Sequence, residues 1–167
     1  SRWPNLAIIG RVCKEELSEN YRRKLDVLDR DLIIAKTSSV RKHLKRVEEN
    51  RGQDVQEFLK DFDCQDIVSF NLQLAIQNCI DSAAHINSEE GVGVPGSLTE
   101  MFYLLEENGY LSEGLTEKMI RAVGFRNLLV HEYGKIDLKQ VFEIANEHIE
   151  DLNKYLLSIF TKLDISE

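Results

Sequence analysis

Four side chains that could act on a phosphate ester lie within eight residues of one another: Arg126, Asn127, His131 and Tyr133. Arginine carries a permanent charge and presents a planar fork of donors that fits phosphate oxygens. Histidine has an unperturbed pKa close to neutral, so His131 can give or take a proton. These residue types suit a reaction at a phosphodiester, with Arg126 as the cation and His131 as the acid or the base.

The spacing of these residues predicts that they share the last turns of a helix. Asn127 and His131 are four residues apart and therefore lie on one helix face, with Arg126 at its edge. Gly134 follows and is a natural residue for the position just beyond a helix end. From spacing alone, however, an ordinary surface pair is the more frequent explanation of an arginine and a histidine on one helix.

The order Arg126, four residues, His131, one residue, Tyr133 resembles the Arg-x4-His-x-Tyr signature of HEPN domains. The flanking sequence is similar to the HepT-like branch, the toxins of HEPN/MNT toxin–antitoxin systems. This similarity includes Gly93-Val94-Pro95-Gly96-Ser97, Gly124-Phe125 directly before the motif and the helix expected from Asp137 to Phe160. It covers about Leu28 to Leu163.

The resemblance implies a metal-independent RNA endonuclease without a cofactor. Arg126 and His131 would be catalytic, Asn127 would support them, and the motif helices of a homodimer would face each other. RNA cleavage would leave a 2′,3′-cyclic phosphate and a 5′-hydroxyl. Tyr133 matches the tyrosine that accepts adenylyl groups from the cognate MNT-type nucleotidyltransferase antitoxin. Such a modification would place negative charge beside Arg126 and His131 and block phosphate entry.

A second function stays open, in which the chain is a non-catalytic HEPN dimer that acts as a binding module for a nucleotidyltransferase. The formal net charge is 21 − 29 = −8, which argues against coating nucleic acid by bulk charge. A small basic site is still compatible with that charge. Around the motif, Lys118, Arg121, Arg126 and Lys135 outnumber Glu117 and Glu132.

Length and composition fit one globular domain. The chain has 167 residues, of which 43% are hydrophobic and 30% are charged. Three cysteines without close spacing indicate reduced packing thiols rather than a disulfide framework or a zinc site. No apolar run reaches the ~18–20 residues that span a bilayer, so we expect no membrane, and the reduced thiols indicate a cytoplasmic location. We expect a partly helical N-terminal extension over 1–27 and the HEPN domain over 28–167.

The periodicity of apolar residues predicts an all-α fold, an antiparallel bundle of four main helices plus short ones. The expected segments are a helix from Glu15 onward, a core helix over Asp29–Glu49, a short helix within 54–60, a central helix over Asp66–Ile86, a Ser97-capped helix ending at Asn108-Gly109, the motif helix from Ser112 to Tyr133 and a last helix over residues 137–163.

Three further patterns bear on function. Gly91 to Gly96 formally matches Gly-x-Gly-x-x-Gly, but it follows a helix instead of a strand, so we expect a turn and not a dinucleotide site. Gly124 indicates either a close approach by another helix or only a small loss of helix propensity, roughly 1 kcal/mol. The basic group Arg41, Lys42, Lys45 and Arg46 is more typical of a solvated helix face than of an RNA contact.

Overall fold

The computed structural model describes residues 19–166, with side chains from Arg30 on, and every regular element among them is a helix. The chain divides into two compact units, one up to Ile34 and one from Ala35 on. Helix α1, Glu19–Asn50, begins in the first unit and ends in the second. It is one continuous helix where the sequence predicted two segments, because no glycine or proline interrupts it. Residues 15–18 and Cys13 lie outside the described residues, and the predicted boundary at residue 27 stays a prediction.

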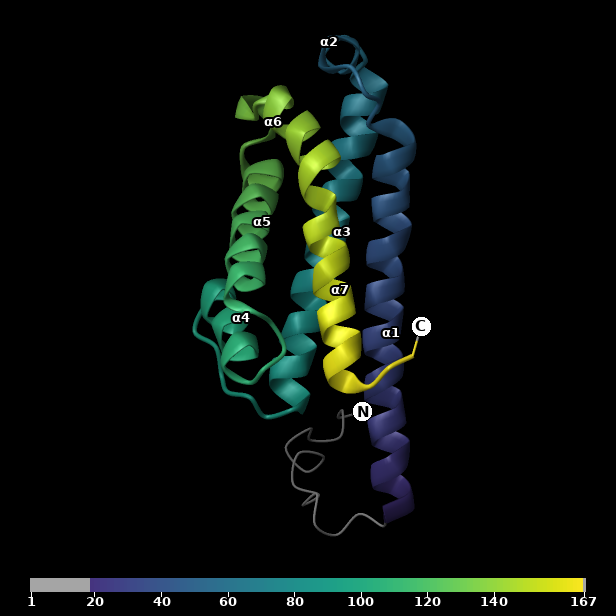
Figure 1. Cartoon of the computed structure of the whole chain (residues 1–167), viewed down its shortest axis with the longest axis vertical. Helices are drawn as coiled ribbons and strands as arrows, with labels where there is room; N and C mark the ends of the chain where they lie inside the picture. The colour runs from purple at the N-terminus through teal and green to yellow at the C-terminus, as the bar shows by residue number, and fades with distance from the viewer. Residues whose placement is uncertain (1–18, 167) are drawn as a thin grey trace, which may run out of the picture. The chain divides into compact units, whose positions relative to one another are not determined.

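The second unit is an antiparallel helical bundle, as predicted. Figure 1 shows α3, α5 and α7 running in alternating directions, and α3 contacts both of the others. No described helix combines the length and the apolar character that a bilayer span needs. The remaining elements are α2 (Val55–Phe58), α3 (Phe62–Glu89), α4 (Leu98–Glu107), α5 (Glu113–His131), the 3₁₀ turn η3 (Tyr133–Lys135), α6 (Leu138–Glu143), the π-helical turn η4 (Ile144–His148) and α7 (Ile149–Leu163).

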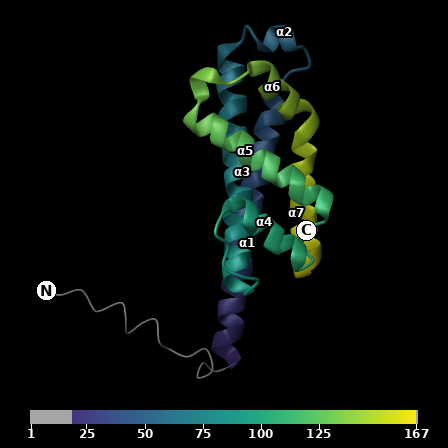
Figure 2. The ribbon, with the colours of Figure 1, turned by 90° about the vertical axis from the view of Figure 1, so that its left-hand side faces the viewer.

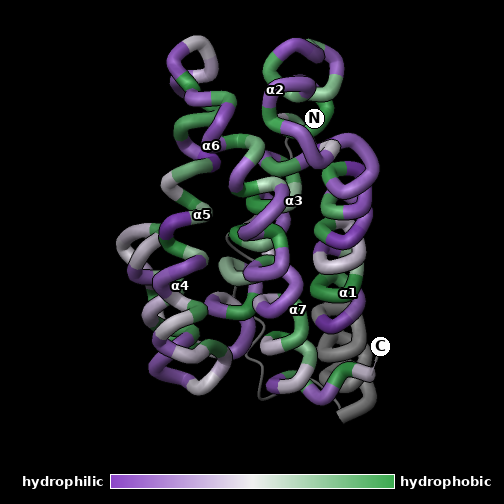
Figure 3. The backbone as a smooth tube through the Cα atoms, turned by 45° about the horizontal axis from the view of Figure 1, so that its top comes forward, coloured by the Kyte–Doolittle hydropathy of each residue, from purple (hydrophilic) through white to green (hydrophobic). Residues whose placement is uncertain are grey.

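Helix α3 is the centre of the core, as its wide apolar surface predicted. The six residues of its predicted stripe are fully buried: Val68, Leu72, Ala75, Cys79, Ala83 and Ile86. Burial raises the pKa of the Cys79 thiol, so it behaves as a packing group. Phe70 was expected to widen the apolar face but is 59% exposed. The same helix therefore has a solvent-facing side, on which polar residues can serve a site. Figure 3 shows hydrophobic and hydrophilic residues alternating along the bundle helices.

Two predicted turns set the length of α4. The Ser97 hydroxyl accepts a hydrogen bond from the Glu100 backbone N–H at 3.1 Å, which confirms Ser97 as the N-cap. The Glu100 carboxylate accepts from the Gly96 backbone N–H at 2.7 Å, one residue earlier than in a standard capping box. Residues 91–96 form the turn that precedes this helix, and Asn108 ends it.

The last helix was predicted as one continuous seam, which is wrong at one turn. The π-helical turn η4 separates α6 from α7 and shifts the register of the helix by adding a residue to one turn. As a result His148, expected on the apolar seam, is exposed, and Ile149 is buried in its place. The seam resumes with Leu152, Tyr155, Ile159 and Leu163, all of which are buried.

One end of the second unit gathers the elements around the motif. The rings of Phe58 in α2 and Phe142 in α6 pack at 5.5 Å between centroids. Figure 1 places the C-terminal end of α5 beside α6 at this end, and Figure 2 shows α5 running obliquely across α3. Because consecutive helices alternate in direction, the start of α3 and the end of α5 lie at the same end of the bundle.

Candidate active site

Helix α5 carries the motif and is fixed mainly through its apolar face. The Ser112 hydroxyl caps it by accepting from the Leu115 backbone N–H at 3.3 Å. Its buried residues are Thr116, Met119, Val123, Phe125 and Leu129. The helix was predicted to run to Tyr133 but ends two residues earlier, at His131, so Tyr133 lies in the following η3 turn. Gly134 is inside that turn and does not cap the helix, because Glu132 holds the cap position.

Gly124 does not mark a close helix approach. A Cβ placed on it would meet no atom within 4 Å, so the predicted close contact is wrong. The alternative, a small loss of helix propensity, agrees with these open surroundings. The position of α5 is therefore set by its buried side chains and not by a glycine contact.

Arg126 is held by two uncharged amides. One guanidinium nitrogen, Nη1, donates to the Asn127 Oδ1 atom at 2.9 Å, and Nη2 donates to the Gln77 Oε1 atom of α3. The third donor, Nε, is buried and has no acceptor among the described residues. Asn127 thus contacts its neighbour Arg126, its predicted supporting role stays a prediction, and Gln77 is a contact that the sequence did not predict.

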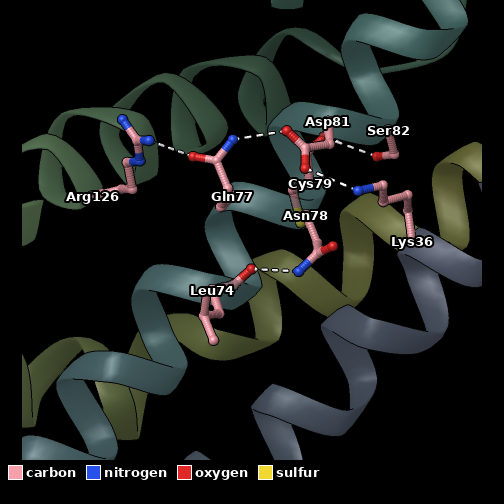
Figure 4. Close-up of polar contacts among 8 residues, drawn as sticks. All are labelled: Lys36, Leu74, Gln77, Asn78, Cys79, Asp81, Ser82 and Arg126. Carbon is pink, nitrogen blue, oxygen red and sulfur yellow. Dashed lines mark hydrogen bonds and ion pairs between the residues drawn. The ribbon is translucent and has the colours of Figure 1, made fainter.

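Gln77 also links Arg126 to α1 through a chain of polar contacts. Its Nε2 atom donates to Asp81 Oδ1 at 2.8 Å, and Asp81 Oδ2 pairs with Lys36 Nζ at 3.1 Å. Figure 4 shows this run from Arg126 through Gln77 and Asp81 to Lys36. The Asp81 carboxylate is therefore already paired with Lys36, and the Gln77 amide separates it from Arg126.

The other two cations of α5 are paired with carboxylates. Lys118 Nζ lies 3.0 Å from Asp151 Oδ1, and Arg121 Nη2 lies 3.5 Å from Glu117 Oε2. The excess of basic residues that the sequence indicated around the motif is thereby largely offset. Within the described residues, Arg126 is the cation of α5 whose contacts leave its charge without a carboxylate. It is the cation best prepared to receive a phosphate.

His131 lies at the last position of α5 and is exposed. Within the part of the chain that the structure describes, its imidazole makes no hydrogen bond. Both ring nitrogens can therefore meet a substrate from solution. The structure thus brings Arg126 and Asn127 into direct contact and leaves His131 accessible near them on the same helix.

Tyr133 is held by a carboxylate that the sequence did not single out. Its hydroxyl donates to Asp66 Oδ1 on α3 at 2.7 Å, and the residue remains 47% exposed. The hydrogen bond to Asp66 is the main reason that the pKa of Tyr133 is raised, with desolvation adding to it. Asp66, Gln77 and Asp81 are spaced by eleven and four residues, which places them on one face of α3. Their shared face on α3 is the signal that could have found them.

One group of potential metal ligands lies elsewhere, on η4 and the helix before it. Glu143, Glu147 and His148 bring their ligand atoms within 4.8 Å of one another, and all three are exposed. His148 already lies 3.4 Å from Asp151. Exposed acidic groups of this kind are common without a metal, and none of these residues belongs to the motif.

An all-helical bundle that presents Arg-x4-His-x-Tyr at the end of one helix is the architecture of HEPN proteins. The family model of ribonuclease HepT-like proteins matches residues 40–159. The mRNA nuclease HepT of Shewanella oneidensis is 35% identical over 126 residues, which are 75% of this chain and 94% of that protein. The tRNA nuclease HepT of Aphanizomenon flos-aquae is 32% identical over 124 residues, 70% of this chain and 82% of that one.

A solved structure agrees with these sequence matches. The tri-AMPylated HEPN toxin of Shewanella oneidensis in complex with MNT antitoxin superposes with a TM-score of 0.72 at 34% identity, over 78% of this chain and 98% of that one. The chain therefore belongs to the ribonuclease HepT-like family. This confirms the predicted family, the predicted fold and the predicted class of enzyme, a ribonuclease.

Proposed function

We propose that this chain is the toxin of a HEPN/MNT toxin–antitoxin pair and cleaves RNA without a metal. Arg126 and His131 are the catalytic residues, Asn127 supports Arg126, and a cognate MNT nucleotidyltransferase neutralises the toxin by adenylylating Tyr133. Membership in the ribonuclease HepT-like family supports this proposal, as do relatives named as mRNA and tRNA nucleases. The AMPylated toxin solved with MNT antitoxin supports the partner and the modification.

The observation that carries the proposal is the environment of Arg126. Lys118 and Arg121 on the same helix are paired with carboxylates, whereas neutral amides orient the Arg126 guanidinium. A transition state at phosphorus gathers negative charge, and a cation that is fixed in place and not neutralised stabilises that charge at little reorganisation cost. A surface arginine with only a structural role would gain more from a carboxylate partner.

The reaction needs two proton transfers. A base takes the proton of the 2′-hydroxyl, whose oxygen attacks the adjacent phosphorus, and an acid protonates the leaving 5′-oxygen. One chain offers a single motif histidine, so we propose a homodimer in which His131 of each copy serves one of the two transfers. The products are a 2′,3′-cyclic phosphate and a 5′-hydroxyl. Which transfer belongs to which copy is decided by the substrate's orientation.

Adenylylation of Tyr133 acts on the same site by charge. An adenylyl group adds a phosphodiester anion and a nucleoside at a residue two positions from His131. The added negative charge repels the RNA phosphate, and the added volume covers the exposed histidine. Modification therefore switches the nuclease off without unfolding it.

The test is cleavage of a 5′-labelled RNA in EDTA by protein whose intact mass shows no adenylyl group. We expect cleavage by the unmodified chain and a loss of about 10²–10⁴ in rate for His131→Ala, the scale of general acid–base catalysis. His148→Ala is the matched control, because His148 is also exposed but lies outside the motif. We expect it to cleave like the parent.

Two results would contradict the proposal. Equal cleavage by His131→Ala and the parent would remove His131 from the mechanism. No cleavage by unmodified protein, together with tight binding to the nucleotidyltransferase and no growth arrest on expression alone, would show the non-catalytic binding module instead.

A further inference from the structure

The contact between Tyr133 and Asp66 joins two segments that are 67 residues apart in sequence. The phenol oxygen lies 2.7 Å from Asp66 Oδ1. Both residues are exposed, so a partner enzyme can approach the pair from solution. Among the described residues, Tyr133 is the one hydrogen-bond partner that Asp66 has through its side chain. The pair is thus separate from the Arg126 contacts, although both involve α3.

A tyrosine hydroxyl is a poor nucleophile until it loses its proton. With an ordinary pKa near 10, about one phenol in a thousand is ionised at pH 7. The hydrogen bond to Asp66 raises the pKa of Tyr133 further, so even fewer are ionised at rest. Attack on a phosphorus atom at neutral pH therefore requires a base that takes the proton while the new bond forms. Such a base must lie about 2.6–3.2 Å from the hydroxyl oxygen.

We propose that Asp66 is the general base for adenylylation of Tyr133, so that the toxin supplies part of the catalytic machinery for its own neutralisation. This inference rests on the proposed function and deepens it. The co-reactant is a nucleoside triphosphate that the partner nucleotidyltransferase binds and orients.

The step balances in atoms and charge. The bond from Tyr133 Oη to the α-phosphorus forms while the Oη proton moves to Asp66 Oδ1. The bond from the α-phosphorus to the oxygen that bridges to the β-phosphate breaks, and pyrophosphate leaves with that electron pair. Asp66 is neutral at this moment, which removes its repulsion toward the new phosphodiester, and it later returns the proton to water.

The Asp66 carboxylate would not help the nuclease reaction. It is hydrogen-bonded to Tyr133 and, among the described residues, forms no hydrogen bond or ion pair with Arg126 or His131. A negative charge also disfavours the approach of an RNA phosphate. A reaction at the Tyr133 hydroxyl explains the position of Asp66. The two contacts on α3 therefore have different roles: the one with Arg126 serves RNA cleavage and the one with Tyr133 serves adenylylation.

The test measures transfer of label from α-³²P-ATP to purified toxin by the cognate nucleotidyltransferase, identified as the MNT protein that relieves growth arrest by this chain. The variants are Asp66→Asn, Asp66→Glu and Tyr133→Phe. Asp63→Asn serves as the matched control, because it makes the same charge change at an exposed position three residues earlier on α3. We expect labelling of Asp66→Asn to fall by about 10²–10⁴, with partial recovery in Asp66→Glu. RNA cleavage by unmodified Asp66→Asn stays at the parent's rate.

The pH profile separates a base from a residue that only positions the ring. We expect the parent's labelling rate to change little from about pH 6 to pH 8, because transfer of the proton to a positioned carboxylate does not require prior ionisation of the phenol. Without the base, the rate of Asp66→Asn follows the phenolate fraction and rises about tenfold per pH unit. A purely structural role would lower the rate in this variant without changing the shape of the profile.

The outcomes distinguish this inference from the proposed function. If the parent is not labelled, or Tyr133→Phe is labelled as well as the parent, Tyr133 is not the acceptor and the proposed neutralisation fails with the inference. If the parent is labelled at Tyr133 but Asp66→Asn has the parent's rate or the parent's level pH profile, the inference on Asp66 is overturned and the proposed function stands. Circular dichroism confirms folding of each variant, and Asp66→Glu carries the test if Asp66→Asn is unfolded.

Discussion

Arg126 and Tyr133 are both tied to α3, but by opposite kinds of partner. The guanidinium, which carries a charge, is bound by the neutral amides of Gln77 and Asn127. The phenol, which is neutral, is bound by the charged carboxylate of Asp66. A contact that served only to anchor the end of α5 would be stronger if Arg126 were paired with a carboxylate, because attraction between opposite charges would add to the hydrogen bond.

The difference shows what each anchor leaves available. Amides orient Arg126 without neutralising it, so its charge can act on an incoming phosphate. A carboxylate next to Tyr133 holds the hydroxyl by its proton, which is the atom that must leave before the oxygen can be modified. One helix thus prepares a cation for cleavage and an oxygen for modification, about three helical turns apart.

Of the variants that test this comparison of the two anchors, the one that removes the cation should show the largest effect. We expect Arg126→Ala to lower kcat/KM for RNA cleavage by about 10²–10³, as for the loss of one transition-state donor. Arg121→Ala is the control, because Arg121 lies on the same helix but pairs with Glu117 at 3.5 Å. Single-turnover cleavage assays measure both. An equal loss in the two variants would mean that overall positive charge matters and the amide-held guanidinium does not.

A carboxylate in place of the Gln77 amide would give Arg126 the kind of partner that Tyr133 has, and so tests the comparison directly. In Gln77→Glu the guanidinium gains an acidic partner, and we expect kcat/KM to fall by about tenfold, the effect of roughly 1.4 kcal/mol. Gln77→Met removes both amide hydrogen bonds but adds no charge, so its loss should be smaller. Steady-state cleavage by the two variants tests this order.

Stability must be followed alongside, because the carboxylate introduced by Gln77→Glu would lie one helical turn from Asp81. Like charges four residues apart on a helix destabilise it by roughly 0.2–0.5 kcal/mol. Thermal melts of both variants account for that effect. A loss in Gln77→Met as large as in Gln77→Glu would show that orientation of Arg126 is what Gln77 contributes, and that keeping the charge free is unimportant.

The sequence predicted the elements well because their signals are local. The stripe from Val68 to Ile86 repeats with the helical period, and Ser97 and Ser112 mark the starts of α4 and α5. The π-helical turn η4 was missed because it adds a single residue without a composition of its own. The close approach expected at Gly124 was wrong, since a glycine in a helix has several causes and sequence does not separate them.

The candidate site was predictable only on the helix that carries the motif. Arg126, Asn127, His131 and Tyr133 are close in sequence, so their spacing brings them together. Their partners on α3 come from 49 residues away for Gln77 and 67 residues away for Asp66. Which side chains meet across two packed helices depends on register and rotation, and a single sequence leaves both open. Their spacing on α3 indicated a shared face but not the pairing.

The smallest predicted effect concerns the tyrosine anchor itself. Asp66 raises the pKa of Tyr133 chiefly by accepting its proton, so we expect Tyr133 to titrate at lower pH in Asp66→Ala than in the parent. Because the folded-state pKa lies above the unfolded value, the hydrogen bond stabilises the fold fully below the unfolded pKa, near 10, and this stabilisation is lost as pH rises through the folded value.

Titration of ¹³C-labelled tyrosines by NMR, with Tyr133→Phe for assignment, measures the shift. Tyr110 is the internal control, since burial is the main cause of its raised pKa and Asp66 is not among the causes. If Tyr133 has the same pKa in both proteins, the hydrogen bond to Asp66 does not form in solution. Only the contacts of Arg126 with the two amides would then remain of the comparison.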